Sequence, residues 1–181
     1  MKIGIDIDCV CNNLVHEWLA YLNMKHNLNV KYEDITSYNM KQFFPMLSDE
    51  QIYEPLNIFS FWNSLQPIED SAKYLKQLRN DGHTIKLITA TDVNSMPVKC
   101  RWVSTYYPFI NIKDIWMVHD KGWIDADILL DDCMDNLEKG NYLSVCFNQP
   151  WNQCYSGLRV NNWKEFYNLI KEKMVKHNEF I

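Results

Sequence analysis

Short apolar runs alternate with amphipathic stretches through the second half of the chain, and this alternation constrains the fold more than any other feature. Residues 83–89 (HTIKLIT) have the length and β-branched content of a buried strand. Residues 97–107 have helical spacing, with a proline near the start where a helix tolerates it. Strands separated by helices imply right-handed crossovers and a mostly parallel sheet sandwiched by helices. We therefore expect an α/β fold built on a Rossmann-like parallel sheet.

The same patterns divide the rest of the chain into elements. The expected strands span residues 2–8, 83–89, 114–119, 127–131 and 142–147. The expected helices span residues 12–28, 69–81, 97–107 and 162–176. We expect Gly82 to end the second helix, and Asn161 or Asn162 to cap the last one.

Residues 12–66 do not follow the alternation. This segment is mixed, rich in aromatic residues, and lies between the first and second expected strands. We interpret it as a helical insertion, and therefore as a candidate cap over a site at the edge of the sheet. The expected domains are an α/β core of residues 1–11 and 67–181 and a helical cap of residues 12–66.

The composition excludes several classes of protein. The chain has 181 residues and a net charge of -5, and it lacks the Lys/Arg runs that a nucleic-acid polymer binder would need. Its apolar runs fall short of the roughly 20 residues that span a bilayer, and its first residues lack a signal-peptide pattern. The six cysteines are scattered, which is typical of reduced thiols, and the five histidines show no ligand spacing. We expect a cytoplasmic monomer or homodimer without a membrane partner.

Polar residues follow four of the expected strands at the point where each strand ends. They are Asp6 and Asp8, Thr89 and Thr91, Lys121 with its two preceding residues, and the pair Asp131 and Asp132. Ligands of open α/β sheets bind beyond the carboxyl ends of the strands. A parallel sheet would therefore bring these four sets together at one edge.

The aspartates suggest a divalent metal. Asp6 and Asp8 would share one face of a strand, and a turn after Asp6 would let both address one reacting atom. Neighbouring carboxylates repel each other, a cost that a divalent cation relieves, and hard oxygen ligands suit Mg²⁺. Asp131 and Asp132 can supply more oxygens. The alternative is that each pair consists of surface acids in a turn or loop.

Thr89 and Lys121 are candidates to bind a phosphoryl group and to neutralise its charge. A hydroxyl and adjacent N–H groups at the end of a strand can hold phosphoryl oxygens, and a lysine ammonium can neutralise them. Taken alone, Thr89 is an ordinary strand residue and Lys121 an ordinary surface lysine. Their order between the two pairs of aspartates is what makes them candidates.

The ordered set Asp6-Ile7-Asp8-Cys9-Val10, Thr89, Lys121 and Asp131-Asp132 resembles the haloacid dehalogenase (HAD) superfamily of phosphohydrolases. Within it the chain resembles the 5′(3′)-deoxyribonucleotidases, and the resemblance covers nearly the whole sequence. The local strings that carry it are EDITSY at 33–38, FSFW at 59–62 leading into LQP at 65–67, DK at 120–121, LLDD at 129–132 and FNQPWN at 147–152.

The resemblance implies a mechanism that passes through an aspartyl-phosphate. Asp6 would attack phosphorus, and Asp8 would protonate the leaving ribose oxygen and later activate water. Lys121 would neutralise the phosphoryl group. Phosphoryl transfer depends on such positioning and charge neutralisation more than on elaborate covalent chemistry.

The resemblance also implies ligand sets. Mg²⁺ would be held by Asp6, the carbonyl of Asp8, and Asp132 with help from Asp131. The phosphoryl group would contact Thr89, Ala90 and Thr91 of the second motif. This chain departs from the family twice, with Cys9 where Gly is common and Ala90 where Ser is common.

The insertion carries seven aromatic residues between positions 38 and 62. Stacking of a base on such a ring contributes about 1–3 kcal/mol. The alternative is that the rings form the core of a small cap. We expect Phe61 and Trp62 to contact the base, because they border the return to the core.

The predicted function is hydrolysis of (deoxy)nucleoside 5′-monophosphates. One alternative is a HAD phosphatase that acts on another small phosphate ester. The other is a phospho-acceptor domain similar to response-regulator receivers, in which the phosphorylated Asp lies between the acidic pair and the Thr. Here no aspartate ends an expected strand between Asp8 and Thr89.

Overall fold

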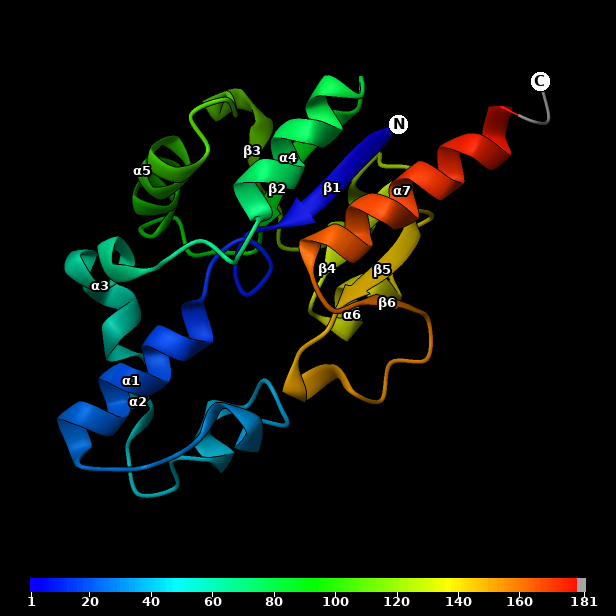
Figure 1. Cartoon of the computed structure of the whole chain (residues 1–181). Coiled ribbons are helices and arrows are strands. Elements are labelled where there is room, and N and C mark those ends of the chain that lie inside the picture. The colour runs from blue at the N-terminus through cyan, green and yellow to red at the C-terminus, as the bar shows by residue number, and fades with distance from the viewer. Residues whose placement is uncertain (179–181) are drawn as a thin grey trace.

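The computed structural model describes residues 1–178, in which six parallel strands form one sheet in the order β3-β2-β1-β4-β5-β6 (Figure 1). The strands are β1 (Lys2–Asp6), β2 (Thr84–Thr89), β3 (Ile115–Met117), β4 (Ile128–Asp131), β5 (Leu143–Phe147) and β6 (Leu158–Val160). The predicted parallel α/β fold is confirmed. The direction of strand succession reverses between β1 and β4, which is where ligands bind in open sheets of this kind.

Helices connect the strands and cover the sheet. They are α4 (Ser71–Asn80), α5 (Met96–Tyr106), α6 (Met134–Leu137) and α7 (Trp163–Asn178). Helices α4 and α7 pack side by side over the sheet, where the rings of Tyr74 and Tyr167 lie 5.3 Å apart (Figure 1). Gly82 follows α4 with a φ of 87°, as the predicted stop requires. The Asn162 side chain accepts the N–H of Glu165 at 2.9 Å, so Asn162 caps α7.

The segment between β1 and α4 forms three helices joined by 3₁₀ turns. They are α1 (Leu14–His26), α2 (Asp49–Tyr53) and α3 (Phe59–Ser64). Figure 1 shows these helices beyond the carboxyl end of β1, to which the arrow of that strand points. The indole of Trp18 donates to the carbonyl of Ile52 at 2.7 Å, which ties α1 to α2. The buried side chains of this segment belong to the same apolar cluster as the sheet, and the division into core and cap stays a prediction.

Several predicted boundaries differ from the structure. The first strand ends at Asp6 rather than at residue 8, because the chain turns there and the N–H groups of Cys11 and Asn12 both donate to the carbonyl of Ile7. Helix α1 starts at Leu14, two residues later than expected. Two elements were not predicted, β6 and α6, because the three residues of β6 are split by Arg159 and α6 is a turn of only four residues, so neither contains an apolar run.

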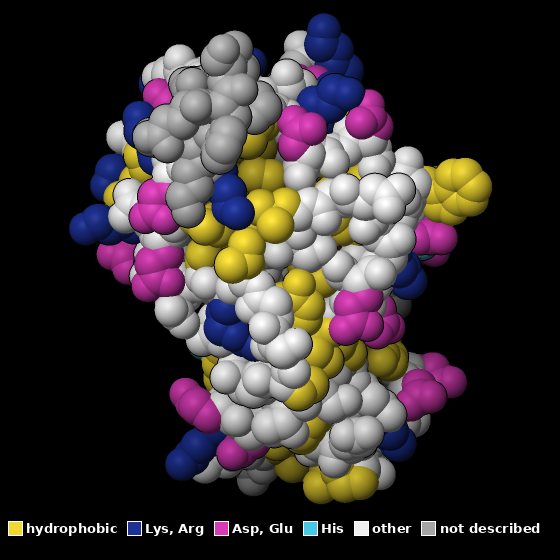
Figure 2. Space-filling model, turned by 90° about the vertical axis from the view of Figure 1, so that its right-hand side faces the viewer, with side chains coloured by type: hydrophobic (Ala, Val, Ile, Leu, Met, Phe, Trp, Pro, Cys, Tyr) yellow, Lys and Arg dark blue, Asp and Glu magenta, His cyan; other side chains and the backbone are white. Residues whose placement is uncertain are grey.

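On the face in Figure 2, lysine and arginine side chains are interspersed with acidic ones, and no basic tract gathers there. None of the helices within residues 1–178 combines the length and apolar character needed to cross a membrane.

Candidate active site

A cavity of about 250 Å³ opens at the carboxyl ends of β1, β2 and β4. Seven residues of the predicted site line it, namely Asp6, Asp8, Thr89, Ala90, Lys121, Asp131 and Asp132. Asp6, Thr89 and Asp131 are the last residues of their strands. The parallel sheet thus brings together groups that lie up to 126 positions apart in the chain, Asp6 and Asp132 being the extremes.

Lys121 bridges two of the aspartates. Its side chain is only 1% exposed, and its Nζ donates to Oδ1 of Asp6 and, at 2.7 Å, to Oδ2 of Asp131. A 3₁₀ turn positions it, because the Asp120 side chain accepts the N–H of Gly122 at 3.0 Å. Burial disfavours the charged amine, but Asp6 and Asp131 raise the pKa of Lys121 above its ordinary value. The ammonium therefore stays protonated between the two carboxylates.

Asp6, Asp131 and Asp132 form a trio suited to a metal ion. One carboxylate oxygen from each lies within 4.8 Å of the others, and all three side chains are buried. Burial raises the pKa of Asp6 to about 7, with Lys121 opposing that shift. Burial also raises the pKa of Asp132 well above its usual range, and the charges of Asp6 and Asp131 add to the effect. A divalent cation would relieve this crowding, so the donor set fits one.

The hydrogen bonds of Asp131 already use both of its oxygens. Oδ1 accepts the N–H of Cys133 at 2.8 Å, and Oδ2 accepts from Lys121 and from the amide of Asn136 at 3.2 Å. Asp132 differs, because Oδ2 takes two donors whereas Oδ1 accepts no hydrogen bond from the described part of the chain. Asp132 is therefore the freer of the two to face a cation.

Asp8 stands apart from the trio and pairs with a lysine that the sequence analysis did not identify. Its Oδ1 accepts the amide of Asn12 at 3.0 Å, and its Oδ2 accepts Nζ of Lys99 on α5. Lys99 is 3% exposed and also donates to the hydroxyl of Thr89 at 2.9 Å. The sequence feature that could have identified Lys99 is its position next to Val98, on the buried face of α5.

The loop that carries Asp8 is fixed by side chains from distant elements. The carbonyls of residues 9–11 accept hydrogen bonds from Gln149, Trp163 and Tyr107, at 2.6, 2.9 and 2.9 Å. Cys9 itself has a φ of 59°, a left-handed conformation that Gly adopts more easily than Cys. Glycine, which the resemblance leads us to expect here, would adopt this conformation without the steric cost that Cys9 bears.

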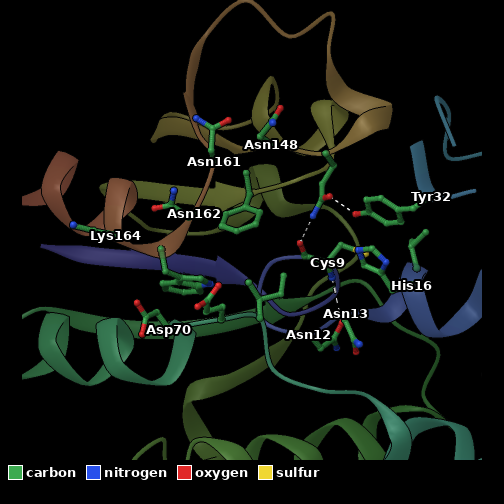
Figure 3. Close-up of a pocket in the computed structure, with 16 residues that line it drawn as sticks. Cys9, Asn12, Asn13, His16, Tyr32, Asp70, Asn148, Asn161, Asn162 and Lys164 are labelled. Carbon is green, nitrogen blue, oxygen red and sulfur yellow. Dashed lines mark hydrogen bonds between the residues drawn. The ribbon is translucent and has the colours of Figure 1, made fainter. Parts of the chain in front are cut away.

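A second cavity of about 500 Å³ lies behind this loop, and Cys9 lines both cavities (Figure 3). The hydroxyl of Tyr32 donates to Gln149, whose amide donates in turn to the carbonyl of Cys9 (Figure 3). The ring of His16 stacks on Tyr32 with centroids 3.7 Å apart. The inserted segment is thus linked to the Asp8 loop through Gln149.

Phe61 and Trp62 do not line the cavity between the aspartates, and the expected contact of these two rings with a base stays a prediction. Both are buried, Phe61 lies edge-on to Tyr21, and the indole of Trp62 donates to the carbonyl of Leu56 at 2.9 Å. Helix α3 packs against α5, where the ring of Trp62 lies 5.1 Å from Nζ of Lys99, whereas the ring of Phe61 faces α1. Thr91 is buried and does not line the cavity either.

Other rings from the same inserted segment do line the cavity. They are Trp18 and Tyr38, which Trp151 joins from the turn after β5. Apolar side chains complete this wall, namely Leu14, Val15, Ile35 and Met40. The cavity lining therefore combines ionic groups with apolar and aromatic ones, and Tyr38 and Trp151 join the two, since each donates a hydrogen bond to Asp132.

Comparison with solved structures places the fold in a known class. A HAD family hydrolase from Deinococcus radiodurans R1 has a TM-score of 0.65 at 11% identity, covering 94% of this chain and 95% of its own. A haloacid dehalogenase-like protein from Agrobacterium tumefaciens has a TM-score of 0.64 at 9% identity, covering 96% and 98%. The chain therefore has the fold of HAD hydrolases.

Sequence relatives define the family more closely. The model of the family "5′ nucleotidase, deoxy (Pyrimidine), cytosolic type C protein" matches residues 1–177. A 5′(3′)-deoxyribonucleotidase of Bacillus subtilis (strain 168) is 30% identical over 165 residues, which are 90% of this chain and 94% of that protein. One from Clostridium acetobutylicum is 29% identical, over 90% and 91%. The chain belongs to this deoxyribonucleotidase family of HAD phosphatases, as the sequence analysis predicted.

Proposed function

We propose that this protein is a magnesium-dependent phosphomonoesterase that hydrolyses deoxynucleoside 5′-monophosphates through an aspartyl-phosphate on Asp6. The observation that carries the proposal is the position of Asp6. It ends β1 in the cavity, its Oδ1 is held by Lys121, and its Oδ2 accepts no hydrogen bond from the described residues. An oriented carboxylate with one free oxygen, beside the buried ammonium of Lys121, is suited to attack an electrophilic phosphorus.

The reaction proceeds in two displacements. In the first, Oδ2 of Asp6 forms a bond to phosphorus while the bond from phosphorus to the ribose oxygen breaks, and Asp8 gives its proton to that oxygen. In the second, Asp8 takes a proton from water, whose oxygen attacks phosphorus and releases inorganic phosphate and the Asp6 carboxylate. Lys121 neutralises phosphoryl oxygens in both steps, and Thr89 contributes its hydroxyl.

Asp132 would hold Mg²⁺ through its free Oδ1, together with the main-chain carbonyl of Asp8 and Oδ1 of Asp6, which has a second acceptor site beside its bond from Lys121 and leaves Oδ2 to attack phosphorus. Asp131 supports the site indirectly, because its oxygens already accept hydrogen bonds from Lys121, Asn136 and the N–H of Cys133. When bound, the cation supplies charge neutralisation for the phosphate dianion. This assignment rests on which oxygens the protein leaves open.

The apolar and aromatic lining of the cavity supports a nucleoside as the leaving group. Tyr38, Trp18 and Trp151 take the role that the sequence analysis gave to Phe61 and Trp62. We infer that residues 12–66 act as the cap that supplies the first two of these rings. A base that stacks on one ring gains about 1–3 kcal/mol, which a simple phosphate ester would not gain.

The decisive test is a phosphate-release assay on the purified protein with Mg²⁺. The panel contains deoxyribonucleoside and ribonucleoside 5′- and 3′-monophosphates, together with glycerol phosphate. We expect the highest kcat/KM with deoxynucleoside 5′-monophosphates. Preference for glycerol phosphate would support the alternative of a different small phosphate ester, and a stable phosphoprotein without turnover would support the receiver-like alternative.

A further inference from the structure

Two donors converge on one oxygen of Asp132. The hydroxyl of Tyr38 donates to Oδ2 at 3.1 Å, and the indole N–H of Trp151 donates to the same atom at 2.9 Å. Trp151 is a near neighbour in the fold, since it lies in the turn after β5. Tyr38 comes from the inserted segment, 94 positions earlier in the chain.

These contacts determine which way the carboxylate faces. A carboxylate oxygen offers about two acceptor sites, so the two donors fill those of Oδ2 and leave Oδ1 open. The rings of Tyr38 and Trp151 meet edge-on with centroids 5.9 Å apart, which fixes both donors. The amide of Asn152 donates to the main-chain carbonyl of Asp132 at 2.9 Å and holds the backbone.

We propose that Tyr38 is a positioning residue that turns Oδ1 of Asp132 toward the divalent cation, and that it thereby couples the docking of residues 12–66 to metal binding. The inference rests on the proposed function for the presence of the cation. Partners that orient a ligand of a metal typically change its affinity by about 10- to 100-fold when they are lost. Because coupling between two equilibria is reciprocal, the cation also stabilises the docked position of the segment.

The test is calorimetric titration of the substrate-free protein with Mg²⁺ alone. Tyr38→Phe removes only the hydroxyl and keeps the ring against Trp151. Tyr53→Phe is the matched control, because Tyr53 lies in the same segment, is 40% exposed, and has a hydroxyl with no hydrogen bond to the described residues. We expect Tyr38→Phe to weaken Mg²⁺ binding about 10-fold or more and Tyr53→Phe to leave it unchanged.

A second measurement separates positioning from general packing. Mg²⁺ should slow tryptic cleavage after Lys31, an exposed residue of the segment, in the unsubstituted protein and in Tyr53→Phe. In Tyr38→Phe this protection should be reduced at the same cation concentration and restored when the concentration is raised about 10-fold. Thermal unfolding in EDTA checks that the variants share one fold without the cation.

The outcomes distinguish the inference from the proposed function. If the unsubstituted protein binds Mg²⁺ and Tyr38→Phe binds it within twofold of that affinity, Tyr38 does not position Asp132 and only the inference falls. If the unsubstituted protein does not bind Mg²⁺, the metal assignment of the proposed function falls and the inference falls with it. Equal losses in Tyr38→Phe and Tyr53→Phe would also overturn the inference, since they would reflect segment packing.

Discussion

Replacement of Lys99 by methionine should remove the lysine that orients Asp8, the proposed acid–base group. Lys99 is buried and donates to both Asp8 and Thr89, which the proposed mechanism uses. Methionine has a similar length and fills the space with little change in packing. Asp8 then keeps the amide of Asn12 as its remaining partner among the described residues.

The size of the effect follows from the contact that is lost. A hydrogen bond to a charged group contributes about 1.5–3 kcal/mol. Since about 1.4 kcal/mol corresponds to a factor of ten in rate, kcat/KM should fall about 10- to 160-fold if the whole loss acts on the transition state. We expect the loss mainly in kcat, because Lys99 orients Asp8 and Thr89 rather than the leaving nucleoside.

Lys86 provides the control for this experiment. It makes one similar ion pair and one similar ring contact away from the cavity, since its Nζ lies 2.5 Å from Asp114 and 4.9 Å from the ring centroid of Trp116, while Nζ of Lys99 lies 5.1 Å from that of Trp62. Lys86→Met should therefore leave the kinetics unchanged. Steady-state phosphate release measures both variants, with circular dichroism to verify folding. A folded Lys99→Met enzyme within threefold of the unsubstituted kcat/KM would refute the reasoning.

Three further predictions follow from the site. Asp6→Asn should abolish phosphate release while near-ultraviolet circular dichroism stays unchanged, and turnover by a folded variant would disprove the covalent mechanism. EDTA should remove activity and added Mg²⁺ restore it, whereas full activity after exhaustive chelation would exclude the metal. At saturating Mg²⁺, Tyr38→Ala should lower kcat/KM for a nucleotide about 5- to 150-fold relative to glycerol phosphate, and Phe61→Ala should alter both substrates equally.

The sequence predicted those parts of the site that follow from strand ends. Asp6, Thr89 and Asp131 close apolar runs, and a parallel sheet brings the ends of such runs together regardless of the length of the connections. Five of the six strands were recognisable for the same reason. The strand β6 was missed because Arg159 divides its three residues, whereas the equally short β3 lies within the apolar run at residues 115–118.

Residues that depend on the packing of helices were harder to predict. The ring cluster around Phe61 has the composition of a base-binding surface, but the packing of α3 against α1 and α5 decides where those rings point, and local periodicity does not encode that packing. Lys99 lies on the buried face of α5, a signal that could have been read from the apolar residues around it. Tyr38 reaches Asp132 through a tertiary contact between the inserted segment and the sheet, for which the sequence carries no spacing rule.

The charges of the site lead to a last prediction, about the order in which ligands bind. Two lysines face four aspartates, namely Lys99 and Lys121 with Asp6, Asp8, Asp131 and Asp132. Full ionisation would leave two uncompensated negative charges, and a phosphate dianion would add two more to a buried space. A divalent cation restores the balance, so phosphate should bind far more weakly without it.

Calorimetric titration with inorganic phosphate, in Mg²⁺ and in EDTA, measures this directly. We expect at least a tenfold loss of affinity in EDTA, which corresponds to about 1.4 kcal/mol. Equal affinity under both conditions would mean that Lys121 alone compensates the phosphate, and that the aspartate trio does not require a cation to accept it.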